Sequence, residues 1–131
     1  MAKNTVLTLK KKVDEGGKVT MVTSYDYTMA ALVEEAGIDM ILVGDSLGMT
    51  MMGYDSTLPV TMDDMVHHTR CVTRACNDTF VVGDMPFGSY NQSPEQAIAN
   101  ASRMLMETGC DAIKLEGGHF CAENDPSSLV S

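Results

Sequence analysis

Acidic residues follow three short apolar runs of the sequence. They are Asp45, Asp84 and Glu116, which follow residues 39–44, 79–83 and 111–115 in turn. If these runs form neighbouring parallel strands about 4.8 Å apart, the three carboxylates converge within roughly 10 Å at the carboxyl-terminal edge of a sheet. Enzymes with α/β folds place their chemistry at this edge. The spacing therefore indicates a functional site built from three carboxylates.

Three carboxylates so close together repel one another and need either protonation or a cation. Oxygen ligands without nitrogen or sulfur partners favour Mg²⁺, which keeps positions open for substrate oxygens. Lys114 stands two residues before Glu116 and can meet a bound anion, and Ser46 offers a hydroxyl and a backbone N–H. The alternative is that each acid caps the helix that follows it. Three acids on consecutive strands, with a lysine on the same face, favour the metal site.

The alternation of side chains along a strand predicts which residues share a face with each acid. Counting back by two from the acids gives Ile41, Val43, Phe80, Val82, Ala112 and Lys114. The opposite positions include Leu42, Val81, Ile113 and Leu115, which suit packing beneath helices.

Other residues give weaker indications. Tyr25 and Asp26 follow the first predicted strand, where substrate contact and a turn or capping role both remain open. His67 and His68 fall in the middle of a predicted helix, a position typical of surface or hydrogen-bonded histidines. The lysine run 10–12 is typical of a solvated helix face, with phosphate binding as the less favoured alternative.

Helices and strands alternate along the sequence. The predicted helices cover residues 6–15, 27–36, 61–75 and 93–108, and the predicted strands cover residues 19–23, 39–44, 79–83 and 111–115. The clearest helix starts are Thr61 with Asp64 three residues on, and Ser93 followed by Pro94. Short strands alternating with helices indicate an α/β fold with a parallel sheet.

The charge balance excludes some classes of partner. Lys and Arg number 9 and Asp and Glu number 18, which gives a net charge of −9 and no electrostatic reason to bind nucleic acid or an anionic membrane. No apolar stretch approaches the ~20 residues that span a bilayer, and the first residues lack the features of a secretory signal. The four cysteines show neither zinc spacing nor a C-x-x-C pair. We therefore expect a cytoplasmic protein with reduced thiols.

Four segments resemble the ketopantoate hydroxymethyltransferase family, in the family's order and at its spacing. They are TSYDYTMA, VGDSLGMTMMGYDSTLPVTMDDMVHHT, GDMPFGSY and IKLEGG. The resemblance covers about residues 7–118, and the match of four segments is far more specific than one short motif.

The resemblance implies a parallel (β/α)₈ TIM barrel of the phosphoenolpyruvate-mutase-like group, of which residues 1–118 would form the first half, about four strands. It implies transfer of a hydroxymethyl group from the co-substrate 5,10-methylenetetrahydrofolate to 3-methyl-2-oxobutanoate, which gives 2-dehydropantoate in pantothenate biosynthesis, with Mg²⁺ as cofactor. By position in the motifs, the implied metal ligands are Asp45, Asp84 and Glu116, and the implied substrate-binding residues are Asp45, Ser46, Asp84 and Lys114.

The resemblance also implies what these residues do not supply. The family's general base is a glutamate in the second half of the barrel, so no catalytic base is expected in this chain. After Gly118 the sequence departs from the family, so residues 119–131 are expected to form a divergent tail and the chain to be a truncated, inactive form. Family members form homo-oligomers, which is the expectation for a complete barrel.

Two alternatives differ in class. The first is another Mg²⁺-dependent 2-oxo acid lyase or mutase of the same barrel group, against which the segment GYDSTLPVT argues because it resembles the hydroxymethyltransferases specifically. The second is a non-catalytic fragment that associates with full-length subunits, which the absent base favours.

Overall fold

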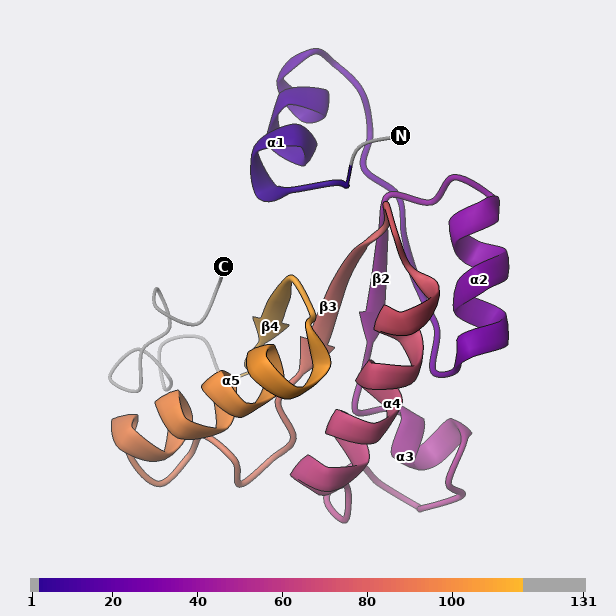
Figure 1. Ribbon diagram of the computed structural model, residues 1–131. Helices are drawn as coiled ribbons and strands as arrows, with labels where there is room; N and C mark the ends of the chain where they lie inside the picture. The colour runs from indigo at the N-terminus through magenta and orange to yellow at the C-terminus, as the bar shows by residue number, and fades with distance from the viewer. Residues whose placement is uncertain (1–2, 117–131) are drawn as a thin grey trace.

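The sheet has four parallel strands in the order of the chain, β1-β2-β3-β4 (Figure 1). The computed structural model describes residues 3–116, so the predicted tail at 119–131 lies outside the described residues. The strands are β1 Met21–Thr23, β2 Met40–Val43, β3 Phe80–Asp84 and β4 Ala112–Lys114. Each lies within or one residue beyond its predicted range, and the predicted parallel α/β sheet is confirmed.

Of the five helices within residues 3–116, three cover one face of the sheet and two lie outside this layer (Figure 1). The covering helices are α2 Tyr27–Glu35, α4 Met62–Ala75 and α5 Pro94–Thr108. Helix α1, Val6–Asp14, lies near the end at which the strands begin, and the short α3, Leu47–Thr50, follows β2. Helix α3 was not predicted, because four residues carry no periodic signal.

The predicted capping residues set the ends of the long helices. Thr61 accepts a hydrogen bond from the Asp64 N–H while the Asp64 carboxylate accepts one from the Thr61 N–H. Ser93 caps α5 with Pro94 at the first helical position. Gly109 ends α5 at φ 71°, a left-handed conformation that a side chain would strain.

The apolar core lies between the sheet and the covering helices. The largest side chains fully buried there include Ile41, Met65 and Met104, one each from β2, α4 and α5. Burying such a side chain stabilises the fold by about 1.5–3 kcal/mol. A Cβ at Gly83 would lie 2.6 Å from the Met104 side chain, so glycine in β3 allows α5 to pack closely.

The side-chain phase predicted for β2 is wrong. Leu42 is the register partner of Val82 and lies on the face away from the helix layer, whereas Ile41 and Val43 are fully buried beneath the helices. The prediction counted back by twos from Asp45. Strand β2 ends at Val43, so the chain leaves the extended conformation before Asp45 and the alternation does not carry through.

The phase predicted for β3 and β4 is confirmed. Phe80, Val82 and Ala112 lie on the second face, and Val81 and Ile113 lie beneath the helices.

Leu9 of α1 packs against the second face. A hollow of about 740 Å³ between α1 and this face is lined almost entirely by apolar side chains. Within residues 3–116, the outer edges of β1 and β4 pair with no further strand.

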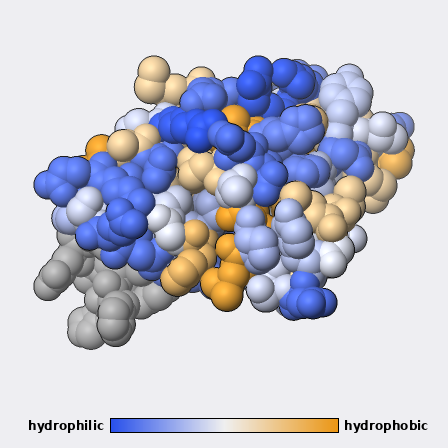
Figure 2. Space-filling view, turned by 90° about the horizontal axis from the view of Figure 1, so that it is seen from below, coloured by the Kyte–Doolittle hydropathy of each residue, from blue (hydrophilic) through white to orange (hydrophobic). Residues whose placement is uncertain are grey.

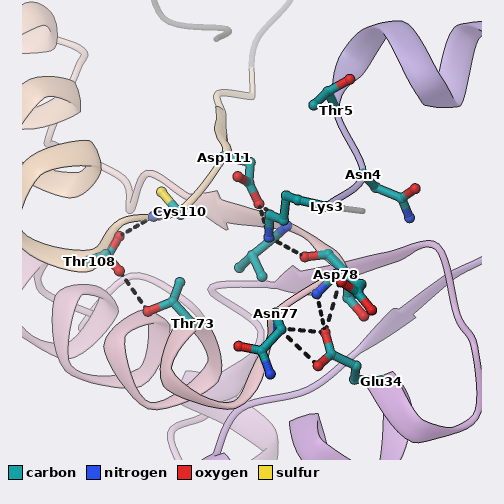
Figure 3. A network of polar contacts seen from close by, with 12 residues as sticks. Lys3, Asn4, Thr5, Glu34, Thr73, Asn77, Asp78, Thr108, Cys110 and Asp111 are labelled. Carbon is teal, nitrogen blue, oxygen red and sulfur yellow. Dashed lines mark hydrogen bonds and ion pairs between the residues drawn. The ribbon is translucent and has the colours of Figure 1, made fainter. Parts of the chain in front are cut away.

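Ionised side chains fix the end at which the strands begin (Figure 3). The Glu34 carboxylate at the end of α2 accepts hydrogen bonds from the N–H groups of Asn77, Asp78 and Thr79 at 2.7–2.9 Å. Asp111 pairs with Lys3 at 2.9 Å and accepts a hydrogen bond from the Val81 N–H. These contacts tie the turn before β3, and the start of β4, to distant parts of the chain.

Asp39, at the start of β2, holds α1 in place. Its carboxylate accepts hydrogen bonds from Lys12 Nζ at 2.7 Å and from the Thr20 N–H at 2.9 Å. The Lys12 contact and the Thr20 donors outweigh burial and hold the pKa of Asp39 below its usual range.

Within residues 3–116, the helices are too short or too polar to cross a membrane. Cys71, Cys76 and Cys110 are free thiols, and Cys121 lies outside the described residues.

We expect the change Glu34→Gln to lower the free energy of unfolding by about 1–2 kcal/mol at pH 7, because it weakens several charge-assisted hydrogen bonds. Burial tends to raise the pKa of Glu34, but the three amide donors together hold it below the ordinary value of 4.5. The stabilisation is therefore present above about pH 4.5 and is lost as the pH falls through the lower, folded-state pKa. Denaturant unfolding at several pH values measures this difference.

The neighbouring exposed acid provides a matched control, because Glu35→Gln removes the same charge from the same helix turn. That variant should unfold like the unchanged chain. Equal effects of both changes would mean that net charge, and not the contact with residues 77–79, carries the stabilisation.

Candidate functional site

The predicted site residues lie at the end where the strands finish. Asp84 is the last residue of β3 and Lys114 is the last residue of β4, and the two are register partners. Asp45 follows β2 by two residues and Glu116 follows β4 by two. Seen from this end, hydrophilic side chains surround a smaller group of hydrophobic ones (Figure 2).

The Asp84 carboxylate is the most buried charged group of the site, at 4% exposure. Its Oδ2 accepts a hydrogen bond from the Asp45 N–H at 2.9 Å. Its Oδ1 is buried and accepts no hydrogen bond from the described residues, although Lys114 Nζ lies 3.3 Å away. A Cβ at Gly44 would lie 3.4 Å from Oδ2 and 3.3 Å from Ser46 Oγ, so glycine there gives the carboxylate room.

Lys114 lies between two carboxylates. Its Nζ is 3.3 Å from Asp84 Oδ1 and 3.1 Å from Glu116 Oε1. Burial alone would lower the pKa of Lys114, but the contacts with Glu116 and Asp84 outweigh it and raise the pKa. Lys114 therefore keeps its positive charge at neutral pH.

The acids of the site carry more charge than Lys114 neutralises. Burial raises the pKa of Asp45, and the negative charges of Asp84 and Glu116 raise it further. Burial also raises the pKa of Asp84, more than the Asp45 N–H and Lys114 lower it. Three carboxylates face one ammonium group, so the ionised site has an excess of negative charge that a cation would relieve.

Two aromatic residues hold the loops of the site. The Tyr25 hydroxyl lies 3.1 Å from Ser46 Oγ, and the Tyr25 carbonyl lies 2.8 Å from His68 Nδ1. The Tyr90 hydroxyl donates to the Glu116 carbonyl at 3.0 Å and accepts from the Glu116 N–H at 3.1 Å. Tyr90 was not predicted, because it lies far from Glu116 in sequence and no local signal links them.

Asp45, Ser46, Asp84 and Lys114 lie close together at the end of the strands. The Glu116 side chain is 72% exposed and contacts Lys114, while Asp84 is buried and Asp45 is half-buried. Within residues 3–116, no three His, Cys, Asp or Glu side chains are arranged as a set of metal ligands. Of the open alternatives, Asp26 is an N-cap, accepting a hydrogen bond from the Met29 N–H at 2.8 Å.

The sequence matches the family model for ketopantoate hydroxymethyltransferase over residues 3–125. It is 58% identical over 118 residues to the 3-methyl-2-oxobutanoate hydroxymethyltransferase of Syntrophomonas wolfei, an alignment that covers 90% of this chain and 43% of that protein. The chain therefore spans less than half the length of the relatives it matches.

Solved enzyme structures share the fold of this chain. A phosphonopyruvate hydrolase in complex with oxalate and Mg²⁺ aligns with a TM-score of 0.71 at 14% identity, over 100% of this chain and 43% of that one. A 2,3-dimethylmalate lyase of the phosphoenolpyruvate mutase/isocitrate lyase superfamily aligns at 0.64 and 16%, over 95% and 42%. The four parallel strands and their helices are therefore the first half of a barrel of the (β/α)₈ TIM type.

Proposed function

The chain belongs to the ketopantoate hydroxymethyltransferase family, and on that premise we propose that its strand ends bind a divalent cation and a 2-oxo acid. The proposed whole reaction transfers a hydroxymethyl group from 5,10-methylenetetrahydrofolate to 3-methyl-2-oxobutanoate and forms 2-dehydropantoate. Residues 3–116 supply the binding half of this site.

The observation that carries the proposal is the buried Asp84 carboxylate. Burying an ionised carboxylate is costly unless charge and hydrogen bonds compensate it. One oxygen of Asp84 accepts a hydrogen bond, while the other is buried and, within residues 3–116, has only the Lys114 ammonium nearby, at 3.3 Å. Such an oxygen is suited to a ligand outside the protein chain.

The donor set fits Mg²⁺. Asp45 and Asp84 offer carboxylate oxygens, and the excess negative charge favours a hard divalent cation. Asp45 and Asp84 would hold the ion, with Glu116 as the third carboxylate that the family resemblance implies. The similar fold of a phosphonopyruvate hydrolase solved with oxalate and Mg²⁺ supports this proposal. When bound, the ion supplies Lewis-acid stabilisation of an enolate.

The other residues of the site bind and orient the 2-oxo acid. Lys114, which stays charged, offsets the negative charge of the substrate carboxylate. Ser46 offers a hydroxyl, whose orientation is restrained by the hydrogen bond with the Tyr25 hydroxyl. His68 in turn fixes the Tyr25 backbone. This chain of contacts preorganises the substrate-binding oxygens.

Removal of the substrate C3 proton needs a base within hydrogen-bond reach, which typically contributes about 10²–10⁴-fold to the rate. The family resemblance assigns this base to a glutamate beyond Gly118. In this proposal, the site residues within 3–116 hold the ion and the substrate. A residue outside 3–116 removes the proton.

Two other functions use the same features. A Mg²⁺-dependent 2-oxo acid lyase or mutase would use the same carboxylates, but the segment at residues 53–61 resembles the hydroxymethyltransferases. A non-catalytic role in association with full-length subunits is favoured by the apolar second face of the sheet and by the two outer edges, which pair with no further strand within residues 3–116.

We expect Asp84→Asn to weaken Mg²⁺ binding by about 10–100-fold, because the change removes one anionic ligand and keeps the shape of the side chain. The acceptor oxygen for the Asp45 N–H remains, so the fold should be retained. Calorimetric titration of Mg²⁺, with and without the 2-oxo acid, measures the effect. Asp14→Asn on α1 removes the same charge from an exposed position and should bind Mg²⁺ normally; unchanged affinity in Asp84→Asn would refute the ligand role.

Lys114→Ala should weaken binding of 3-methyl-2-oxobutanoate by about tenfold or more, because a charge-assisted contact is lost. Mg²⁺ affinity should stay the same or rise, since a nearby positive charge disappears. Titrations of each ligand separate the two effects, with Lys18→Ala as the control for loss of an exposed lysine. A large loss of Mg²⁺ affinity with normal substrate affinity would contradict this role.

Residues 1–131 expressed alone should associate and show no measurable hydroxymethyltransferase activity. The apolar second face favours association, and the base lies beyond Gly118. Light scattering gives the mass in solution, and an assay for 2-dehydropantoate gives the turnover, with a full-length relative as positive control. A monodisperse monomer whose turnover equals that of the full-length relative would contradict this prediction.

A further inference from the structure

All three arginines of the sequence meet in one hollow on the helix layer, in a chain whose net charge is −9. The hollow has a volume of about 330 Å³ and lies between α4 and α5. Its lining consists of Asp63, Val66, His67, Arg70, Arg74, Arg103 and Glu107. None of the residues of the strand-end site lines it, so the hollow is a separate feature.

The acids of the hollow are already paired with one arginine. Arg103 of α5 contacts Asp63 Oδ1 at 2.6 Å through Nη2 and Glu107 Oε2 at 2.8 Å through Nε. Within residues 3–116, neither Arg70 nor Arg74 lies within ion-pair distance of an acid, and both are exposed.

Arg70 and Arg74, which pair with no acid within residues 3–116, place two positive charges on one side of α4. Arg70 and Arg74 are four residues apart, and His67 is three residues before Arg70, so all three lie on one helix face. Like charges at this spacing slightly destabilise a helix. Within residues 3–116, no acid offsets the charge of these two guanidinium groups, and an anion between them would offset it.

The lysines of α1 differ from Arg70 and Arg74, because each of them lies close to an acid. Lys10, Lys11 and Lys12 each have an acid within 4 Å, namely Asp14, Glu15 and Asp39. Six of the nine cationic residues pair with described acids, and only Lys18, Arg70 and Arg74 do not within residues 3–116. Of these three residues, Arg70 and Arg74 lie one helix turn apart and line the same hollow.

We propose that the α4–α5 hollow binds a phosphate-bearing small molecule through Arg70 and Arg74, with His67 and Arg103 beside it. The planar guanidinium matches two oxygens of a phosphate at once, which a lysine does not. Val66 is the one apolar residue of the lining, so the ligand is recognised by charge and not by an apolar group. The volume is at the lower end for small-molecule pockets, which suits a group of diphosphate size.

Calorimetric titration of the 131-residue chain with pyrophosphate tests this proposal, with inorganic phosphate and citrate as comparison anions. We expect saturable binding of about one pyrophosphate per chain. The double change Arg70→Gln, Arg74→Gln should weaken it by about tenfold or more, because both forks are lost. Glutamine is a good helix former, so the exposed helix face should remain folded, which circular dichroism verifies.

The matched control is Lys10→Gln, Lys11→Gln, which makes the same change in net charge on α1 and should bind pyrophosphate normally. Arg74→Lys keeps the charge but loses the fork and should also weaken binding, which keeps the test valid if the double variant does not fold. Absence of saturable binding, equal loss in the α1 control, or preference for citrate over pyrophosphate would each overturn the proposal.

Discussion

The buried carboxylate of Asp84 is the constraint on which the site depends. A carboxylate at 4% exposure needs compensating charge or hydrogen bonds, and the surrounding residues provide only part of it. The Asp45 N–H satisfies one oxygen, and Lys114 approaches the other. These contacts require β2, β3 and β4 to lie side by side in this order, because each strand delivers one of the groups. Burial and the negative charge of Glu116 keep the pKa of Asp84 raised despite both contacts.

Contacts at the opposite end of the sheet, where the strands begin, hold in place the strands that carry these groups. Glu34 binds the turn before β3, Asp39 holds α1 near the start of β2, and Asp111 ties the start of β4 to Lys3. Ionic contacts thus define where the strands begin, and the apolar core beneath α4 and α5 holds them side by side. The division matches that of (β/α)₈ enzymes, in which one end of the sheet supports stability and the other carries chemistry.

The sequence alone predicts the parts of this arrangement that depend on local pattern. The helix caps at Thr61 and Ser93 and the shared face of Asp84 and Lys114 follow from residue types and from alternation within a strand. The phase of β2 fails because Asp45 lies beyond the strand, in a turn that alternation does not describe. The clamp of Tyr90 on Glu116 is a contact between residues 26 positions apart, which no local pattern encodes.

The most direct test is whether a divalent cation binds between Asp45 and Asp84. Mn²⁺ takes the same oxygen ligands as Mg²⁺, and its unpaired electrons broaden nearby amide resonances in an NMR spectrum. At substoichiometric Mn²⁺, we expect the amides of residues 44–46 and 83–85 to broaden first and to recover when Mg²⁺ is added in excess. Broadening centred on exposed acids such as Asp14 or Asp63, with the resonances around Asp84 unaffected, would contradict it.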